Sequence, residues 1–383
     1  MLQQLESDSY ALPHTLRKEL PVQPLATDRM AVILNQNANK VNDRVRRRLA
    51  GLVPSADLYY SRSLEEAEGF ARHIVQAGYG TVVSGGGDGT LVNIVNQVCH
   101  YVDEANEWRM QRARHFGEPQ ALLQYPEFGV LKLGTGNGLS HVVGASNPAK
   151  DLHKLMSGPR HPAIEVDLIE CEGTKFMFGG IGYDARILND YIHLKQWAAK
   201  SKYLKRLSAT AAGYLLAVCG RSVPDFLRNG FTQNVRVTSE GDNCYYMDSR
   251  RGDRAISVPR GTVLFEGPAG VVSVGTSPYF GFGFTMFPFA GTMPGLMNLR
   301  IATMGPLEAL SHLPSLWNGN LRSPSILDFM CDKVKVETDK PVCYQHSGDG
   351  QGKRDVLNFA MSNKPLKLVD YYGHPFQNSV PRQ

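Results

Sequence analysis

The residues best suited to chemistry in this 383-residue chain lie in a glycine-rich stretch, Gly85 to Thr90. An apolar run, Tyr79 to Val83, precedes the stretch and apolar residues at helical spacing follow it, which predicts a strand, a tight glycine turn and a helix. Such a turn lets backbone N–H groups approach a phosphate, and the helix N-terminus adds a favourable dipole. The Asp88 carboxylate can hold a metal ion, and the other candidate ligand-binding residues are Gly86, Gly87, Gly89 and Thr90. An ordinary strand-to-helix turn is the alternative interpretation.

A second glycine-rich turn, Gly134 to Gly138, has the same surroundings. It follows an apolar run, Phe128 to Leu133, and leads into helical spacing from Leu139 to Val143. Two such turns at strand ends of one α/β domain can face the same crevice. The pair therefore favours phosphate binding over an ordinary turn, with Gly134, Thr135 and Asn137 as candidate ligands.

A run of amides follows the first predicted strand, Met30 to Leu34, and supplies Asn35 and Asn37 as candidate binding residues. Side chains at the carboxyl end of a strand suit a ligand crevice in an open α/β sheet. A polar turn that caps the next helix, Asp43 to Leu52, is the alternative. A second short strand closes on Ser61.

Strands and helices alternate through this part of the chain, and Leu64 to Ala77 reads as an amphipathic helix. The alternation predicts a doubly wound α/β domain over residues 29–155. Residues 100–127 have no clear period, and we expect the C-terminal part of that segment to be a loop.

Residues 156–370 have a different sequence pattern, with short segments of alternating apolar and polar residues between frequent glycines and prolines. This pattern predicts an antiparallel β domain. The expected strands are Ala163 to Ile169, Lys175 to Phe178, Val235 to Thr238, Val263 to Phe265, Val271 to Val274, Asn298 to Ala302, Lys333 to Glu337 and Leu366 to Val369.

One helical segment, Asp184 to Leu216, interrupts these strands and places lysines beside Trp197 and Tyr203. Basic residues mixed with aromatic ones can dock on an anionic membrane. A charged helix face in water explains the same pattern, so both interpretations stay open.

Composition limits the class of protein. The net charge of +5 is compatible with anionic ligands or lipid surfaces, but it gives nucleic-acid binding no further support. Six cysteines are scattered without a C-x-x-C pair, which indicates a reducing compartment. Residues 1–28 are polar and lack the apolar core of a signal peptide, so we expect a loosely held extension. With no apolar run of membrane-spanning length, the expected location is cytoplasmic, with peripheral membrane association.

The chain resembles the diacylglycerol kinase catalytic superfamily, which includes sphingosine, ceramide and bacterial lipid kinases. Gly86 to Thr90 is similar to the family's GGDGT signature, which NAD kinases share, and Gly134 to Asn137 matches a G-T-x-N turn that favours lipid kinases. Other matches, in the family's order from residue 29 to 370, are Asn35 with Ala38, Ser61 with Ala67, Gly182 to Ala185, Pro278 to Pro288 and Gly348 to Gly350.

This resemblance implies ATP- and Mg²⁺-dependent phosphorylation of a lipid hydroxyl in a cleft between the α/β domain and a β-sandwich domain. It implies that the glycine turns, with Asn35, Asn37 and Ser61, hold the nucleotide. It gives Asp349 the role of general base and Asp88 a catalytic role at the metal. It also implies that the chain end, residues 371–383, returns to the first domain.

Several family positions differ in this chain. The acidic segment D-D-G-L-L-D reads Met293 to Asn298 and contains no acid, and the glutamate of D-G-E is Gln351. These losses keep a pseudokinase open as an alternative, in which the protein binds nucleotide or lipid without chemistry. A second alternative is a kinase that phosphorylates a soluble hydroxyl compound, as NAD kinases do. The sequence identifies neither the lipid nor the oligomeric state.

Overall fold

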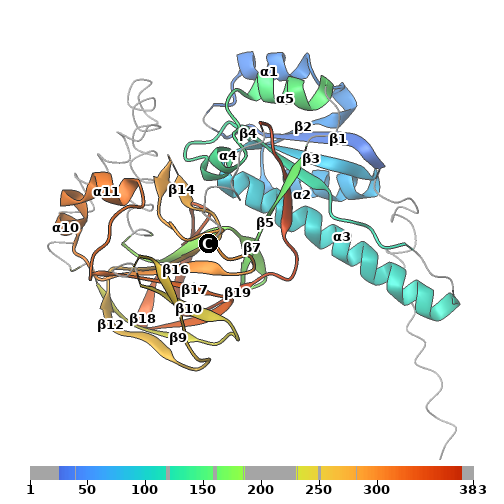
Figure 1. Ribbon diagram of the computed structural model, residues 1–383. Coiled ribbons are helices and arrows are strands. Elements are labelled where there is room, and N and C mark those ends of the chain that lie inside the picture. Colours follow the sequence, from blue (N-terminus) through green and yellow to red (C-terminus); the bar gives the residue numbers. More distant parts are fainter. Residues whose placement is uncertain are drawn as a thin grey trace, which may run out of the picture.

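The computed structural model describes residues 26–38, 40–117, 121–157, 162–183, 185, 230, 232–248, 252–281 and 283–372. Its first domain is built on a six-stranded sheet in the order β2-β1-β3-β4-β20-β5 (Figure 1). All neighbours in this sheet are parallel except β20 and β5. The strands are β1 (Ala26–Asn35), β2 (Leu58–Ser61), β3 (Tyr79–Gly86), β4 (Glu127–Lys132), β5 (Ala163–Val166) and β20 (Leu366–Val369).

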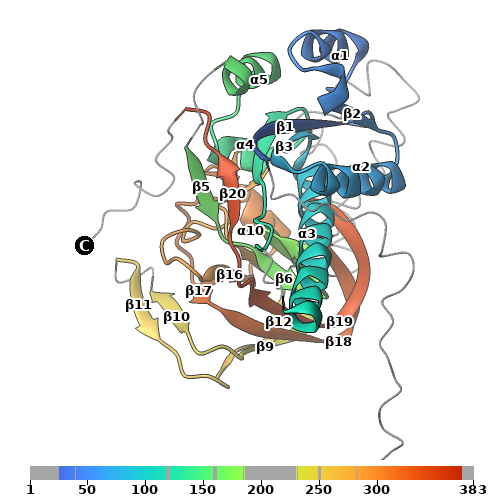
Figure 2. The same cartoon turned by 90° about the vertical axis from the view of Figure 1, so that its right-hand side faces the viewer.

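Helices cover both faces of this sheet, with α1 and α5 on one side and α2 and α3 on the other (Figures 1 and 2). Local sequence sets where they begin. Asn42 caps α1 by accepting a hydrogen bond from the Val45 N–H at 3.0 Å, and Ser63 caps α2 by accepting one from Glu66 at 3.2 Å. The helices are α1 (Asp43–Ala50), α2 (Leu64–Gln76), α3 (Asp88–Phe116), α4 (Gly138–Val142) and α5 (Pro148–Ser157), with a 3₁₀ turn at Ser55–Asp57.

Helix α3 is longer than the sequence suggested, because it continues to Phe116 and ends at Gly117 with φ 69°. The expected loop is therefore confined to the residues after Gly117. The periodicity is hidden because two polar residues on the inner face are buried. Asn106 exchanges hydrogen bonds of 2.7 and 2.9 Å with the backbone of Leu123, and Arg109 donates one of 2.7 Å to the Ala121 carbonyl.

Two segments that we expected in the β-rich domain, β5 and β20, pair in the first sheet instead. Leu368 lies opposite Phe128 of β4, and Leu366 lies opposite Val166 of β5. Alternating side chains identify a strand but not the sheet that it joins. The chain thus returns to the first domain before the expected point at Tyr371, whose hydroxyl accepts a hydrogen bond from the Val130 N–H at 3.0 Å.

The second domain contains a twelve-stranded antiparallel sheet, which confirms the expected combination of an α/β domain and an antiparallel β domain. The long strand β18 branches this sheet, because residues 334–338 pair with β9 and residues 344–346 pair with β8. The strands are β6 (Ile169–Cys171), β7 (Thr174–Phe176), β8 (Phe178–Gly182), β9 (Gln233–Ser239), β10 (Cys244–Asp248), β11 (Arg254–Ser257), β12 (Val263–Ala269), β13 (Val271–Gly275), β16 (Met297–Ala302), β17 (Ile326–Cys331), β18 (Lys333–His346) and β19 (Asp349–Met361). A separate hairpin, β14 (Tyr279–Gly281) and β15 (Phe284–Thr285), and the helices α10 (Pro306–Ser311) and α11 (Leu313–Trp317) lie beside it (Figure 1).

Among the helices of the described residues, none combines the length and apolar character needed to span a membrane. The segment of lysines and aromatics for which we weighed membrane docking lies outside the described residues, as do residues 1–25 of the expected extension. The last residues of that extension begin β1, where Ala26 lies opposite Tyr79.

Candidate active site

The site lies at the carboxyl ends of β1 and β3, where the strand order of the first sheet reverses. Strand β2 lies on one side of β1, and β3 and β4 lie on the other. Ligands of open α/β sheets bind at such a switch point. The two strand ends are joined here by a hydrogen bond of 3.0 Å from Asn35 Nδ2 to Thr90 Oγ1.

The first glycine turn is shorter than we expected, because β3 continues through Gly86 and α3 begins at Asp88. Only Gly87 separates the strand from the helix. The first turn of α3 has N–H groups without intrahelical partners, and it carries Gly89 and Thr90 at this edge of the sheet.

The second glycine turn packs directly against the first. A Cβ atom on Gly134 would overlap the Cα atom of Gly87, so only glycine allows this approach. Asn137, with φ 52°, closes its own turn. Its Oδ1 accepts from the Gly134 N–H at 2.9 Å and its Nδ2 donates to the Gly134 carbonyl at 2.7 Å. Gly134 and Asn137 therefore support the site structurally.

Asp88 joins the two turns through hydrogen bonds to the start of α4. Its Oδ2 accepts from the Gly138 N–H at 2.8 Å and its Oδ1 from the Leu139 N–H at 3.1 Å. Burial raises the pKa of Asp88 and the nearby Asp349 carboxylate adds to this rise, while the two N–H donors oppose it.

These contacts bear on the predicted metal role of Asp88, because both of its oxygens already accept hydrogen bonds. Within the described residues, no three His, Cys, Asp or Glu side chains gather into a group that could hold a metal ion. Among the described residues we therefore assign no dedicated metal ligand.

An open pocket of about 620 Å³ lies between this edge of the first sheet and the β18–β19 hairpin. Six predicted site residues line it: Asn35, Asn37, Ser61, Gly89, Thr90 and Asp349. The remaining predicted residues, Gly86, Gly87, Asp88, Gly134, Thr135 and Asn137, are not among its lining residues. The structure therefore separates the prediction into a set that faces the pocket and a set that supports it.

Asp349 reaches the pocket from the second domain. The turn before it consists of Ser347 and Gly348, with φ 51° and 82°, and Asp349 begins β19 opposite His346. Two positive φ angles in a two-residue hairpin loop explain the glycine at position 348. The Asp349 carboxylate lies so close to Gly89 that a Cβ atom on this glycine would overlap Asp349 Oδ2.

A clamp beside the pocket holds the two domains together. Asn96 of α3 donates from Nδ2 to the Lys175 carbonyl at 2.7 Å, and its Oδ1 accepts from the Lys175 N–H at 2.8 Å. Because Lys175 belongs to β7, this pair anchors the second domain to the same helix that begins at the pocket. We did not predict the clamp.

The sequence analysis also missed pocket residues on α2, α3 and β18. His346 lines the pocket, and its ring stacks on Phe176 with centroids 4.8 Å apart. Burial lowers the pKa of His346. Asn93 and Gln97 of α3 and Leu64 of α2 line the pocket too. A signal for the α3 residues exists, since three amides at positions 93, 96 and 97 interrupt the apolar pattern of this helix.

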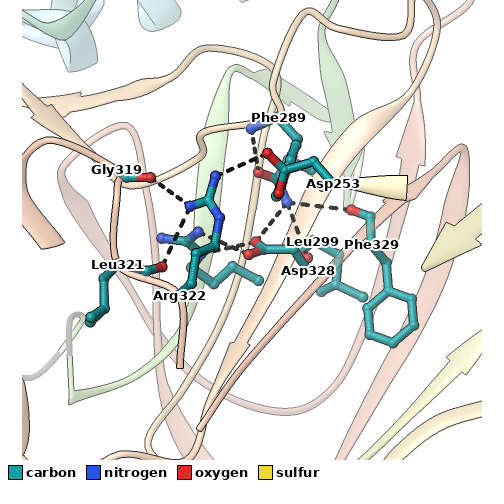
Figure 3. A network of polar contacts seen from close by, with 10 residues as sticks. Asp253, Phe289, Leu299, Gly319, Leu321, Arg322, Asp328 and Phe329 are labelled. Carbon is teal, nitrogen blue, oxygen red and sulfur yellow. Dashed lines mark hydrogen bonds and ion pairs between the residues drawn. The ribbon is translucent and has the colours of Figure 1, made fainter. Parts of the chain in front are cut away.

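In the second domain, Asn298 stands where the resemblance implies an acid, and its side chain belongs to a buried polar network around Asp328. Figure 3 shows this network from close by. Asp328 accepts from Asn298 Nδ2 at 3.1 Å and from Arg300 Nε and Nη2 at 2.9 Å each. Asn298 Oδ1 accepts from the Phe289 N–H at 3.2 Å. This region therefore has a structural ion pair in place of a metal-binding group.

The aromatic stretch from Pro278 to Pro288 takes part in a local core. Phe287 is fully buried, and Phe280 and Phe284 pack against the same cluster. At the start of the stretch, the Tyr279 ring lies 5.6 Å from that of His141, just beyond the second glycine turn. Packing accounts for these described side chains. Phe282, and Asp184 of the Gly182 to Ala185 match, lie outside the described residues.

The comparison with known families agrees with this geometry. Residues 29–170, less than half of the chain, match the diacylglycerol kinase catalytic domain. The matched residues contain most of β1, all of β2 to β4, both glycine turns and the first-domain side of the pocket, and the match supports a kinase of this superfamily.

Solved structures extend the similarity beyond the catalytic domain. A crystal structure of a candidate diacylglycerol kinase from Bacillus anthracis strain Sterne is 15% identical, with 89% of this chain and 97% of that one covered at a TM-score of 0.58. Another structure of a diacylglycerol kinase from the same organism is 13% identical, with 89% and 96% covered at a TM-score of 0.53. At these identities the similarity shows the fold alone, and it extends over both domains. No curated protein matches the chain.

Proposed function

We propose that the protein is an ATP-dependent lipid kinase that phosphorylates a lipid hydroxyl. The observation that carries this proposal is the contact of the Asp349 carboxylate with Gly89, at the first turn of α3 and inside the pocket. A carboxylate beside a helix N-terminus combines a proton acceptor with a phosphate-binding position. The diacylglycerol kinase catalytic domain provides the family context.

The first turn of α3 and its neighbours would hold the nucleotide phosphates. The N–H groups of this turn point toward its N-terminal end, and the helix dipole favours an anion there. Thr90 and Asn35 add side-chain polar groups that are already positioned by their mutual hydrogen bond. Ser61 and Asn37, at the end of β2 and after β1, extend the polar lining.

Asp349 is the proposed general base. ATP supplies the phosphoryl group when it is bound. Asp349 would accept the proton of the lipid hydroxyl as that oxygen forms its bond to the γ-phosphorus, while the bond from this phosphorus to the bridging oxygen breaks and ADP leaves. The position of Asp349 against Gly89 would put it beside the phosphates if these bind at the first turn of α3. Positioning and proton acceptance are the two contributions that a kinase of this type needs from its side chains.

A lipid acceptor and a peripheral contact with the membrane are part of the same proposal. They are supported by the family of the catalytic domain and by the net charge of +5, which suits an anionic lipid surface. The acceptor is a diacylglycerol, a sphingoid base, a ceramide or a similar lipid alcohol.

Transfer of labelled phosphate from ATP to a panel of these lipids in mixed micelles, with Mg²⁺ present, tests the proposal. We expect one class of lipid to become labelled and Asp349→Asn to abolish labelling while ATP binding persists. Asp355→Asn is the matched control, because Asp355 is an exposed residue of the same strand outside the pocket lining. Full activity of Asp349→Asn would contradict the role of the base.

Two observations favour a second candidate, a nucleotide-binding pseudokinase. Asp88 has both oxygens engaged, and Asn298 belongs to a structural network instead of an acidic metal site. ATP binding without any labelled product, with soluble alcohols included in the panel, would support this candidate over the kinase.

A further inference from the structure

Helices α1 and α5 share a basic outer face. They lie side by side on one face of the first sheet, opposite α2 and α3 (Figures 1 and 2). Each helix turns buried apolar residues toward the sheet, among them Leu49 in α1 and Leu152 in α5. On each helix, three basic residues at positions i, i+3 and i+4 point the other way, so their side chains share one surface. This basic face consists of Arg44, Arg47, Arg48, Lys150, His153 and Lys154.

Little negative charge lies on these two helices to balance the basic face. Asp43 pairs with Arg46 at 3.6 Å. Asp151 is buried and accepts a hydrogen bond from the Tyr372 hydroxyl at 2.9 Å. Among the described residues, no acid forms an ion pair with Lys150 or with the three arginines of the basic face. Most of its positive charge is therefore uncompensated within that part of the chain.

The stability of the two helices does not account for all of these charges. Like charges three or four residues apart repel one another on a helix. Arg47, Arg48 and Lys154 lie in the last turns of their helices, where the helix dipole favours a cation. Arg44 and Lys150 lie in the first turns, where the dipole disfavours one. These two cations are unfavourable for the folded chain alone, and they indicate an anionic partner.

Two exposed side chains with apolar surface border the basic face. Met156 of α5 is 39% exposed, and Tyr372, which follows β20, is 46% exposed. The half-buried Lys154 positions Tyr372, with its Nζ atom 4.3 Å from the centre of the ring. Such side chains suit the boundary between lipid headgroups and acyl chains. A partner that offers only phosphates would leave them in contact with water.

We propose that the basic face docks the protein on a membrane surface rich in anionic phospholipids. The choice of partner rests on the proposed function, because a lipid acceptor resides in a bilayer. Cations near an anionic bilayer add to its attraction for the protein, and salt weakens that attraction. The basic face also begins near the proposed active site, since Asn37 lines the pocket and Asn42, five residues later, caps α1.

Cosedimentation of the full-length protein with vesicles, in the absence of ATP, tests this surface. We expect binding to vesicles of phosphatidylcholine mixed with phosphatidylglycerol, weaker binding at high salt, and little binding to phosphatidylcholine alone. A basic-face variant that combines Arg44→Gln, Arg47→Gln and Lys150→Gln should bind the mixed vesicles about a hundredfold more weakly. Each cation near such a surface contributes about fivefold to the affinity.

The matched control removes the same charge from exposed positions on α3, β11 and β18. It combines Arg114→Gln, Arg254→Gln and Lys340→Gln, and it should bind the mixed vesicles within about twofold of the wild type, because salt screens distant charges.

Two further measurements separate docking from folding. Glutamine is a good helix former and removes the first-turn cations, so the basic-face variant should keep or raise the Tm of the wild type. A variant with Arg44→Lys, Arg47→Lys and Lys150→Arg keeps the charge and should keep the vesicle binding.

Several outcomes would overturn the inference. These are wild-type binding by the glutamine variant of the basic face, loss of binding in the variant that keeps the charge, and failure of the wild-type protein to bind the mixed vesicles. Tighter binding to a DNA duplex than to the vesicles, lost in the same glutamine variant, would overturn it too and identify a nucleic-acid surface. Vesicle binding without any labelled lipid in the kinase assay would contradict the proposed function and leave the docking surface standing.

Discussion

The carboxylate of Asp349 occupies the space that a side chain on Gly89 would need. The two residues belong to different domains, Gly89 to the first turn of α3 and Asp349 to the first position of β19. Their contact brings a proton acceptor to a helix N-terminus and requires glycine at position 89. The active site that we propose is therefore formed only when the two domains are docked.

Gly89→Ala should reduce phosphate transfer by about a hundredfold, because the new methyl group displaces the Asp349 carboxylate by a distance that reaction geometry does not tolerate. Steady-state kinetics with the lipid identified in the panel measures this effect. Gly69→Ala is the matched control, since Gly69 of α2 has open space around its Cα atom. That control should keep full activity and gain up to about 1 kcal/mol of stability. Wild-type activity of Gly89→Ala would show that Asp349 is not positioned by this contact.

Asp88→Ala should lower the free energy of unfolding by about 1–3 kcal/mol, because the N–H groups of Gly138 and Leu139 lose their acceptor. Urea denaturation measures the change. Asp43→Ala, at an exposed carboxylate in the first turn of α1, should cost less than about 1 kcal/mol. If Asp88→Ala keeps wild-type stability and loses only nucleotide binding, then Asp88 acts on the ligand and our structural assignment fails.

Arg300→Met should destabilise the protein by about 3–5 kcal/mol, because it leaves the carboxylate of Asp328 buried without its charged partner. Replacing both residues, with Asp328→Leu added, should restore much of this loss, since no unpaired charge remains. Denaturant titrations of the single and double variants form the test. Arg260→Ala breaks an exposed ion pair with Asp242 and should cost less than about 1 kcal/mol. A mild effect of Arg300→Met would mean that water reaches this network.

The pH dependence of stability should contain a contribution from His346. Burial lowers its pKa in the folded protein, so the unfolded chain takes up a proton first as the pH falls through about 6.5. Proton uptake by the unfolded chain favours unfolding, and the contribution is therefore destabilising at acidic pH and absent above neutrality. His346→Leu should lose less stability than the wild type between pH 7.5 and pH 5.

The matched control for this prediction is His153→Leu, which changes an exposed histidine of α5. Urea midpoints at the two pH values should show the wild-type loss for His153→Leu and a smaller loss for His346→Leu. Identical losses in both variants would contradict the assignment to His346.

Much of the local structure could be predicted, because its causes are local. Apolar periodicity identified β3 and the start of α3, and glycines identified the turns around Gly87 and Gly134. The same reasoning failed where a residue is buried by a distant partner. Asn106 looked like a surface residue because its partner, the backbone of Leu123, belongs to a later loop.

For the candidate site, the sequence supplied the residues at strand ends, and the structure decided which of them face the pocket. Asn35 and Thr90 lie where parallel strands end, so their chemistry could be anticipated from pattern alone. Asn137 matched a family motif equally well, but its side chain makes its hydrogen bonds to Gly134 of its own turn. A motif identifies a residue without stating what its side chain contacts.

By itself, the sequence determined most element types and the glycine turns, because backbone sterics and side-chain periodicity act over a few residues. Its short motifs also indicated the resemblance to a kinase family. Only the tertiary structure decided that β5 and β20 complete the first sheet, that Asp349 lies against Gly89, and that Asn93 and Gln97 share a pocket. Those contacts join segments far apart in the chain. They depend on how whole surfaces pack, which no short stretch of sequence encodes.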